Sequence, residues 1–373
     1  MQKTLLTIML VLISCVAEAK GFDTDLSLNL NNYYGYTHYT KPSPRIYKNN
    51  NLNSSLDVYS RITYNINSSY KASLIGYIMA DTAKEIENYN QGVWGEEFFA
   101  LFEAPFGDIS VGQDYNVAYN FSVGAPRIGS YNVNNSYISN FITNPNWYKK
   151  DSKMIYKTLN STYINTDGSS LKINYITPEY KGIKIGFTYI PQVYAQNGLV
   201  AKNSPYKDNS AYVFGVNGFW KVLGYEVETS LGYAVFDEID KELSAGINVY
   251  RKGWTIGASY KKTNKDNKYA VDQSALYDGY RNGSAYNLGL SYEIGPFTTG
   301  ISYFSSKSDD FNNSDKIISF SNSFQYNKYT TLSMTIARQK SIDNKTTKGN
   351  AFILGLELSL WKKYAYYPVI KHF

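Results

Sequence analysis

A repeated alternation of apolar and polar residues is the feature that most constrains the fold of this chain. In the stretch Leu171–Pro191, for example, Ile183, Ile185 and Phe187 alternate with Lys184 and other small or polar residues. Successive side chains of a β-strand point to opposite faces, so such a segment has one apolar and one polar face. We count 16 segments of this kind. The chain is therefore predicted to be all-β, and both a soluble sandwich and a membrane barrel fit the pattern.

The connectors between these segments alternate between short and long. Lys221–Gly224 and Arg251–Gly253 are short turns, whereas Thr37–Asn53, Asp114–Gly168 and Lys262–Gly283 are long loops. Outer-membrane barrels have an even number of strands, short periplasmic turns and longer external loops. A soluble sandwich has no reason to alternate its loop lengths in this way. The connectors thus favour a 16-stranded antiparallel transmembrane β-barrel.

Aromatic residues flank many of the short turns, in a chain that contains 38 tyrosines. Across such turns, Trp220 pairs with Tyr225 and Tyr250 pairs with Trp254. Further aromatics stand at the opposite ends of these strands and their neighbours, namely Tyr233, Tyr260, Tyr286 and Tyr303. Amphipathic rings settle at the two membrane–water interfaces and form girdles around a barrel. We therefore expect an aromatic girdle at each rim.

The N-terminus has the pattern of a secretory signal peptide over residues 1–19. Lys3 supplies the positive start, Leu5–Ile13 the short apolar run and Ala17–Ala19 the small-residue cleavage site. The residues that end at Cys15 also resemble a lipoprotein signal, in which Cys15 would become a lipidated N-terminus. Cys15 is the only cysteine, so no disulfide forms within the chain.

The rest of the chain reads as one barrel domain, residues 20–361. No apolar run after residue 19 approaches the roughly 18 residues of a membrane-spanning helix. The negative mean hydropathy is compatible with a barrel, because only every second strand residue meets lipid. Residues 362–373 are expected to be a C-terminal tail or the end of the last strand, since Pro368 and Lys371 interrupt the alternation.

The polar face of the segments carries charges that would be costly in a dry core. In a barrel of about 16–18 strands the same face lines an aqueous channel. We predict four pore-lining residues, Arg61, Lys71, Glu97 and Lys172. The expected function is passive diffusion of small hydrophilic solutes and ions through a water-filled channel. The net charge of +6 is spread along the chain, which gives no basis for a nucleic-acid partner.

Three segments resemble the Gram-negative general porins, the trimeric porins of the bacterial outer membrane. Phe106–Tyr119 resembles the strand before their third loop, and Tyr326–Gln339 resembles their penultimate strand. The segment YITPEYKGIKIGFTYIP matches the family at Tyr175, Pro178, Glu179, Gly182, Gly186 and Tyr189. The resemblance spans about residues 20–361. It implies a homotrimer of 16-stranded barrels, each with the third loop folded inward as a constriction.

The same resemblance makes the segment Asp114–Lys150 the constriction loop. Its candidate residues are Asp114, Arg127, Lys149 and Lys150. The family usually has arginine where Gln113 stands, and its third loop often carries several acids, whereas Asp114 is the only acid of this segment. From this balance, together with Arg61 on the predicted pore wall, we expect a weak preference for anions.

The sequence does not predict an enzyme, and we expect no cofactor and no metal. The two histidines, His38 and His372, are far from mid-barrel, and no nucleophile elbow, phosphate loop or zinc spacing occurs. Glu96 and Glu97 are adjacent on a strand and point to opposite faces, so they share no catalytic site. We expect a homotrimeric porin in contact with outer-membrane lipid and small hydrophilic solutes. The alternative is a structural or adhesive outer-membrane barrel whose external loops bind partners.

Overall fold

A computed structural model describes most of the predicted barrel domain. The described ranges are 22–39, 50–81, 92–128, 147–150, 153–156, 159, 161–168, 170–193, 210–237, 240–265, 282–309, 314–343 and 345–360. The predicted signal peptide (residues 1–19) and tail (residues 362–373) lie outside the described residues and stay predictions. No helix in the described part of the chain is long and apolar enough to cross a membrane.

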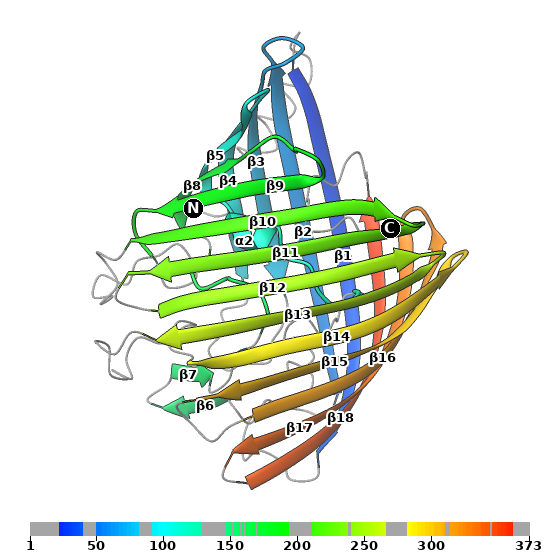
Figure 1. The fold of residues 1–373 in the computed structure, drawn as a ribbon. Helices are drawn as coiled ribbons and strands as arrows, with labels where there is room; N and C mark the ends of the chain where they lie inside the picture. The colour runs from blue at the N-terminus through cyan, green and yellow to red at the C-terminus, as the bar shows by residue number, and fades with distance from the viewer. Residues whose placement is uncertain are drawn as a thin grey trace.

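Sixteen antiparallel strands form a closed barrel in which each strand pairs with its neighbours along the chain (Figure 1). The barrel closes between the first and last strands, where Tyr33 stands opposite Gly355. The strands are β1 (Phe22–Tyr39), β2 (Asn50–Asn65), β3 (Lys71–Asp81), β4 (Gly92–Ala104), β5 (Gly107–Gln113), β8 (Leu171–Ile176), β9 (Ile183–Ile190), β10 (Ala211–Val222), β11 (Tyr225–Phe236), β12 (Asp240–Arg251), β13 (Trp254–Lys265), β14 (Gly283–Ile294), β15 (Phe297–Ser308), β16 (Ser314–Asn327), β17 (Thr330–Asp343) and β18 (Lys345–Leu360). The prediction of a 16-stranded antiparallel barrel is confirmed.

The long connection between β5 and β8 holds the other elements of the described chain. It contains the short helix α2 (Val117–Asn120) and the two-stranded sheet of β6 (Trp147–Lys150) and β7 (Lys153–Tyr156). The side chain of Asn116 caps α2 by accepting a hydrogen bond from the Tyr119 amide at 2.9 Å. Figure 1 shows α2 behind β10 and β11, on the inner side of the barrel wall.

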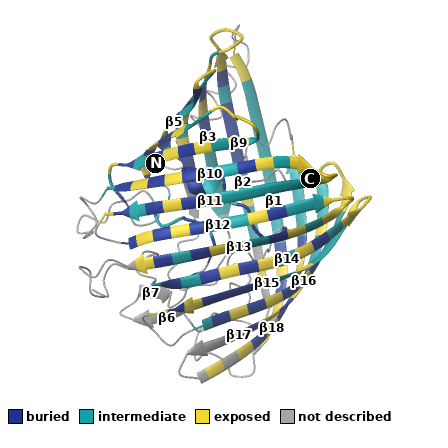
Figure 2. Ribbon diagram, in the orientation of Figure 1, coloured by how far each residue is buried: buried dark blue, intermediate teal, exposed yellow. Residues whose placement is uncertain are grey.

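Along each strand, residues that face outward alternate with residues that face the lumen (Figure 2). On β16, Ile318 and Phe320 are exposed on the outer face, whereas Ser319 and Ser321 are buried on the inner face. Apolar side chains in that outer position meet lipid when a barrel is in a membrane. The outer face is thus suited to contact with lipid, and the inner face lines the interior of the barrel.

The two rims of the barrel differ in their connections. At the short-turn rim, three turns place two successive residues at positive φ: Lys181–Gly182, Leu223–Gly224 and Lys252–Gly253. This is type I′ geometry, whose twist matches that of paired strands. At the opposite, long-loop rim, most connections are long, but β11 and β12 are separated only by residues 237–239 and β17 and β18 only by Asn344. The expected alternation in loop length is therefore incomplete.

Aromatic side chains lie on the outer face at the short-turn rim. The rings of Trp254 and Tyr292 have centroids 4.5 Å apart. Tyr250, which we expected in the girdle, faces the lumen instead, and its hydroxyl accepts a hydrogen bond from Asn248 Nδ2 at 2.9 Å. The register explains the difference, because Trp254 stands opposite Arg251 and not opposite Tyr250. The girdle prediction is therefore wrong for Tyr250.

Candidate functional site: the barrel lumen

The segment that follows β5 enters the barrel and lies on its inner wall. Three of its backbone amides donate hydrogen bonds to inward-facing side chains: Val117 to Thr188 Oγ1 at 2.9 Å, Val123 to Ser230 Oγ at 3.1 Å and Ala125 to Asn287 Oδ1 at 3.0 Å. The three acceptors belong to β9, β11 and β14, so the segment crosses several strands. The third loop therefore takes up part of the cross-section of the lumen.

A row of glycines crosses the wall beneath this segment, and we name it the glycine track. A Cβ atom at Gly246 would lie 2.0 Å from the carbonyl oxygen of Val123, and one at Gly257 would lie 2.3 Å from that of Gly124. Each strand from β9 to β15 contributes one such position: Gly186, Gly215, Gly232, Gly246, Gly257, Gly289 and Gly300. Side chains at these positions would hold the loop away from the wall.

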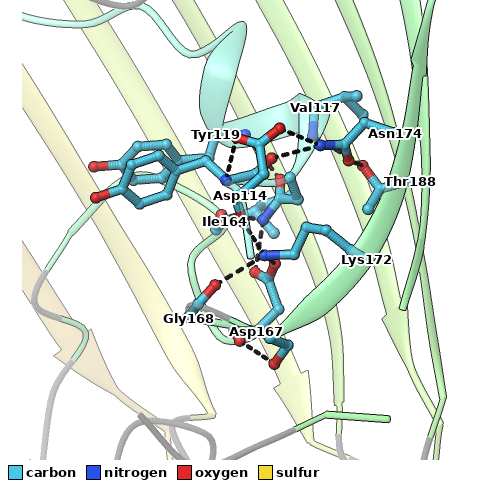
Figure 3. A network of polar contacts seen from close by, with 12 residues as sticks. Asp114, Val117, Tyr119, Ile164, Asp167, Gly168, Lys172, Asn174 and Thr188 are labelled. Carbon is cyan, nitrogen blue, oxygen red and sulfur yellow. Dashed lines mark hydrogen bonds and ion pairs between the residues drawn. The ribbon is translucent and has the colours of Figure 1, made fainter. Parts of the chain in front are cut away.

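Lys172 of β8 joins the two ends of the third loop (Figure 3). Its ammonium pairs with Asp167 Oδ2 at 2.7 Å and donates to the carbonyl oxygens of Asp114 and Gly168. Asn116 donates to the other Asp167 oxygen at 2.6 Å. The Lys172 side chain has no exposed surface. Because a buried charge without partners is costly, these contacts fix both loop ends against the wall. We call them the loop anchor.

Asp114 lies where the chain leaves β5 for the lumen. Ser110 Oγ and Asn174 Nδ2 donate to its Oδ2 at 2.7 and 2.9 Å. Asn174 in turn accepts a hydrogen bond from Thr188 Oγ1 at 2.7 Å, which links β8 to β9. Burial raises the pKa of the Asp114 carboxyl above its ordinary range, although these hydrogen bonds act in the opposite direction. Asp114 is thus a buried residue that ties the start of the loop to the barrel wall.

The returning end of the loop is also tied to the inner wall. Thr166 Oγ1 donates to Glu242 Oε1 at 2.6 Å, and Lys261 Nζ pairs with the same oxygen at 3.0 Å. Leu159 packs among inward-facing apolar side chains that include Phe304 and Ile317. The inner face is therefore not polar throughout. Where the loop covers it, it carries apolar residues.

Arg61 lies on the inner face of β2 between two carboxylates. Its Nη2 is 2.5 Å from Glu103 Oε2, and Asp25 stands directly opposite it on β1. Its Nε donates to Thr63 Oγ1 at 3.1 Å and to Ser73 Oγ at 3.2 Å. Only 8% of Arg61 is exposed. The guanidinium is therefore held in one orientation, with its charge compensated by neighbouring acids.

The other predicted site residues occupy different environments. Lys71 is exposed on β3 near the short-turn rim, and Glu97 is buried on the inner face of β4. Arg127 is exposed on the loop segment that follows the glycine track. Lys149 and Lys150 belong to β6, but their side chains lie outside the described residues. These five residues are therefore distributed along the lumen and its loop.

Two of the predicted residues, Lys172 and Asp114, do meet, but in the buried loop anchor. Lys172 therefore does not stand on the open wall where we expected it. Sequence reasoning missed Asp167 and Glu103, their charge partners, and it missed the glycine track. A visible signal for the track was the recurrence of one glycine near the middle of successive segments, such as Gly246 and Gly257.

Inward-facing acids outnumber inward-facing bases from mid-barrel to the short-turn rim. Directly opposed residues of paired strands share a face, so the register assigns each charge to the lumen or to lipid. On the described strands, the inward acids in this region are Asp23, Asp25, Asp57, Glu97, Glu103, Asp108, Glu226, Glu228, Glu293 and Glu357, and the inward bases are Arg61, Lys71, Lys184 and Lys221. This part of the lumen therefore has an excess of negative charge.

Solved structures with the same fold come from several bacteria. The anion-selective porin from Comamonas acidovorans aligns with a TM-score of 0.59 and 12% identity, covering 91% of this chain and 100% of that chain. Salmonella typhi OmpF, in complex with daunomycin, aligns with a TM-score of 0.59 and 14% identity, covering 91% of this chain and 98% of that chain. The trimer form of in-vitro folded OmpT from Vibrio cholerae aligns with a TM-score of 0.57 and 10% identity, covering 91% of this chain and 100% of that chain. Such low identities show a shared fold alone.

Comparison with curated protein sequences finds no match. The family model of Gram-negative porins, however, matches residues 6–345, which is most of the chain. The closed barrel, the loop on its inner wall and the charged lumen agree with that match. The chain therefore belongs to the Gram-negative porin family and forms an outer-membrane channel for passive diffusion.

Proposed function

We propose that the lumen is a cation-preferring pore for small hydrophilic solutes and ions, narrowed by the third loop. The observation that carries the preference is the excess of inward-facing carboxylates between mid-barrel and the short-turn rim. Carboxylates along a pore attract cations and repel anions. The candidates for wall charges are Arg61, Lys71 and Glu97, and the candidates for the constriction are Arg127, Lys149 and Lys150. Asp114, the other residue predicted there, is buried at the start of the loop.

The proposed cation preference reverses the expectation drawn from the sequence. That expectation gave weight to Arg61 and to the basic residues of the third loop. Arg61, however, is paired with Glu103 and stands opposite Asp25, so its field in the lumen is compensated. The inward acids are spread over many strands, and the register places them on one common face. The balance of charge in the lumen is thus the better guide to selectivity.

The reversal potential across a planar bilayer tests this proposal. In a KCl gradient, purified protein should give a potential of the sign that cation flow produces. The preference should weaken at high salt, because ions screen exposed charges beyond about 10 Å at 0.1 M. A reversal potential of the opposite sign would overturn the cation preference. Silence across repeated insertions would overturn the pore itself.

We also propose that the barrel works as a homotrimer, exported with the signal peptide of residues 1–19. The fold similarity to an OmpT of Vibrio cholerae solved in a trimer form supports this assembly. Conductance should appear in groups of three equal steps for each insertion event. In mild detergent, light scattering should give the mass of three chains, and a mass of one chain at all concentrations would contradict the trimer.

A further inference from the structure

Three tyrosines of the third loop pack against one another inside the barrel. The rings of Tyr115 and Tyr119 are stacked, with centroids 4.2 Å apart and planes inclined by 16°. Tyr163, from the returning end of the loop, packs T-shaped against Tyr119, with centroids 5.7 Å apart. We call these three residues the tyrosine cluster. The two ends of the loop thus build one aromatic surface.

The position of α2 on the wall determines which way the cluster faces. Val117 and Ala118 are buried against the inner wall, next to Gly186 and Gly232 of the glycine track. In Figure 3 the ring of Tyr119 points away from this wall. The cluster therefore faces the lumen.

Partial exposure distinguishes the tyrosine cluster from the residues that pack the loop onto the wall. Phe121 and Val117 belong to the same segment and are only 5% and 0% exposed. All three tyrosines of the cluster are partly exposed instead. A solute in the lumen can therefore reach the cluster.

A carboxylate stands on the wall beside this part of the loop. Glu228 occupies the inward position of β11 next to Ser230, whose hydroxyl accepts a hydrogen bond from the Val123 amide at 3.1 Å. Asn217 Nδ2 donates both to Glu228 Oε1 and to the carbonyl oxygen of Phe121, each at 3.4 Å. Glu228 is one of the inward acids between mid-barrel and the short-turn rim. The loop segment that carries the tyrosine cluster therefore borders the acidic region.

The wall next to the start of the loop carries further aromatic rings. Tyr59 and Tyr77 are directly opposed on β2 and β3, and they face inward with Phe99 of β4. Phe99 stands directly opposite Gly112 of β5, so these rings lie near the point where the chain leaves the wall for the lumen. Glu97, directly opposite Tyr77, adds a carboxylate. This part of the lumen thus combines aromatic rings with negative charge.

We propose that the tyrosine cluster is a binding site in the pore for organic cations of the quaternary ammonium class. The negative face of an aromatic ring attracts a cation, and aromatic rings recognise quaternary ammonium groups in particular. The carboxylates of the lumen raise the local concentration of cations near the cluster. This inference rests on the proposed cation preference and adds a class of solute to it.

Choline and its neutral isostere 3,3-dimethyl-1-butanol test the site on the wild-type protein. The two compounds share their shape and their hydroxyl group, and only choline carries a charge. In a planar bilayer at fixed KCl, choline should reduce the single-channel current in a saturable manner, relative to an equal addition of NaCl. The isostere should leave the current unchanged. Equal effects of the two compounds, or no saturable effect of choline, would overturn the cation site.

Matched double variants locate the site. Tyr115→Leu/Tyr119→Leu should weaken the block by choline on the order of tenfold, because the rings that attract the cation are lost. Tyr115→Phe/Tyr119→Phe keeps the rings and should retain the block. The control Tyr260→Leu/Tyr286→Leu removes two directly opposed tyrosines from the outer face and should be blocked like the wild type. A wild-type block in the first variant, or an equal loss in the control, would overturn the site.

The reversal potential keeps this inference apart from the cation preference on which it rests. Measured in a KCl gradient without choline, it reports the preference alone. A cation-preferring pore that choline does not block would overturn the tyrosine cluster as a site and leave the preference standing. A block by choline in an anion-preferring pore would overturn the preference and leave the site standing.

Discussion

At the scale of single residues, the surroundings decide whether a charge serves the pore or the fold. Lys71 and Lys172 both lie on the polar face of their segments, and the sequence treats them alike. Lys71 is exposed, whereas Lys172 has no exposed surface and pairs with Asp167 at 2.7 Å. The difference arises because the third loop covers the inner face of β8. A lysine covered in this way needs partners, and the loop supplies them.

The change Lys172→Met tests the loop anchor. It should lower the free energy of unfolding by about 3–5 kcal/mol, because Asp167 would remain buried without its partner. Urea unfolding in detergent measures this loss. Lys172→Met/Asp167→Leu should recover part of it, and Lys328→Met, at an exposed turn lysine, should stay within about 0.5 kcal/mol of the wild type. A Lys172→Met protein with wild-type stability would exclude the anchor.

At the scale of elements, the third loop and the strands β9 to β15 fit together as one unit. Buried backbone amides need hydrogen-bond partners, and the loop finds them in wall side chains such as Thr188 and Ser230. The glycine track lets the loop backbone approach closely enough for these bonds. The loop position therefore depends on small residues as much as on charges.

The change Gly246→Val tests this fit. Its Cβ would stand 2.0 Å from the Val123 carbonyl oxygen, so the loop must move toward the lumen. We expect a lower single-channel conductance and a loss of about 1–3 kcal/mol in the free energy of unfolding from overpacking. Gly224→Ala is the control: Gly224 has φ +79 but its added Cβ would meet no atom within 4 Å. It should cost stability without changing conductance, and an unaltered conductance in Gly246→Val would contradict the fit.

At the scale of the whole molecule, closure of the sheet divides the chain into two environments. Every strand contributes one face to lipid and one to the interior, and closure leaves no edge to pair with another chain. Charges from strands far apart in the sequence then act on the same lumen. Ion selectivity therefore depends on the charges of all strands together. Arg61, Glu103 and Asp25 are three of these charges, and they lie next to one another.

The change Arg61→Ala tests whether the combined charge of the lumen sets its ion selectivity. Loss of the guanidinium removes one positive charge beside Glu103 and Asp25 and makes the lumen more negative, so the permeability ratio of K⁺ to Cl⁻ should rise. The reversal potential in a KCl gradient measures the ratio, and the folded barrel is checked by the difference in migration between unheated and heated gel samples. Arg251→Ala, at an exposed arginine of the short-turn rim, should leave the ratio unchanged. A fall in the ratio for Arg61→Ala would contradict an acidic lumen.

The sequence by itself determined the number of strands, their antiparallel order and their lipid-facing side. These follow from the alternation of side chains with a period of two residues. The alternation is a local property of each strand and does not depend on what the strand packs against. It also indicated the short turns, since residues such as Gly224 and Gly253 suit positive φ. Local patterns thus specify the barrel because each hairpin carries its own signal.

Only the tertiary structure decided which inward residues meet water. Val213 and Phe236 face inward but are buried beneath the third loop, and Lys172 is buried in the anchor. The physical reason is that burial on the inner wall comes from a segment distant in sequence. A period of two assigns a side chain to the interior, but contact with water there depends on what else occupies it.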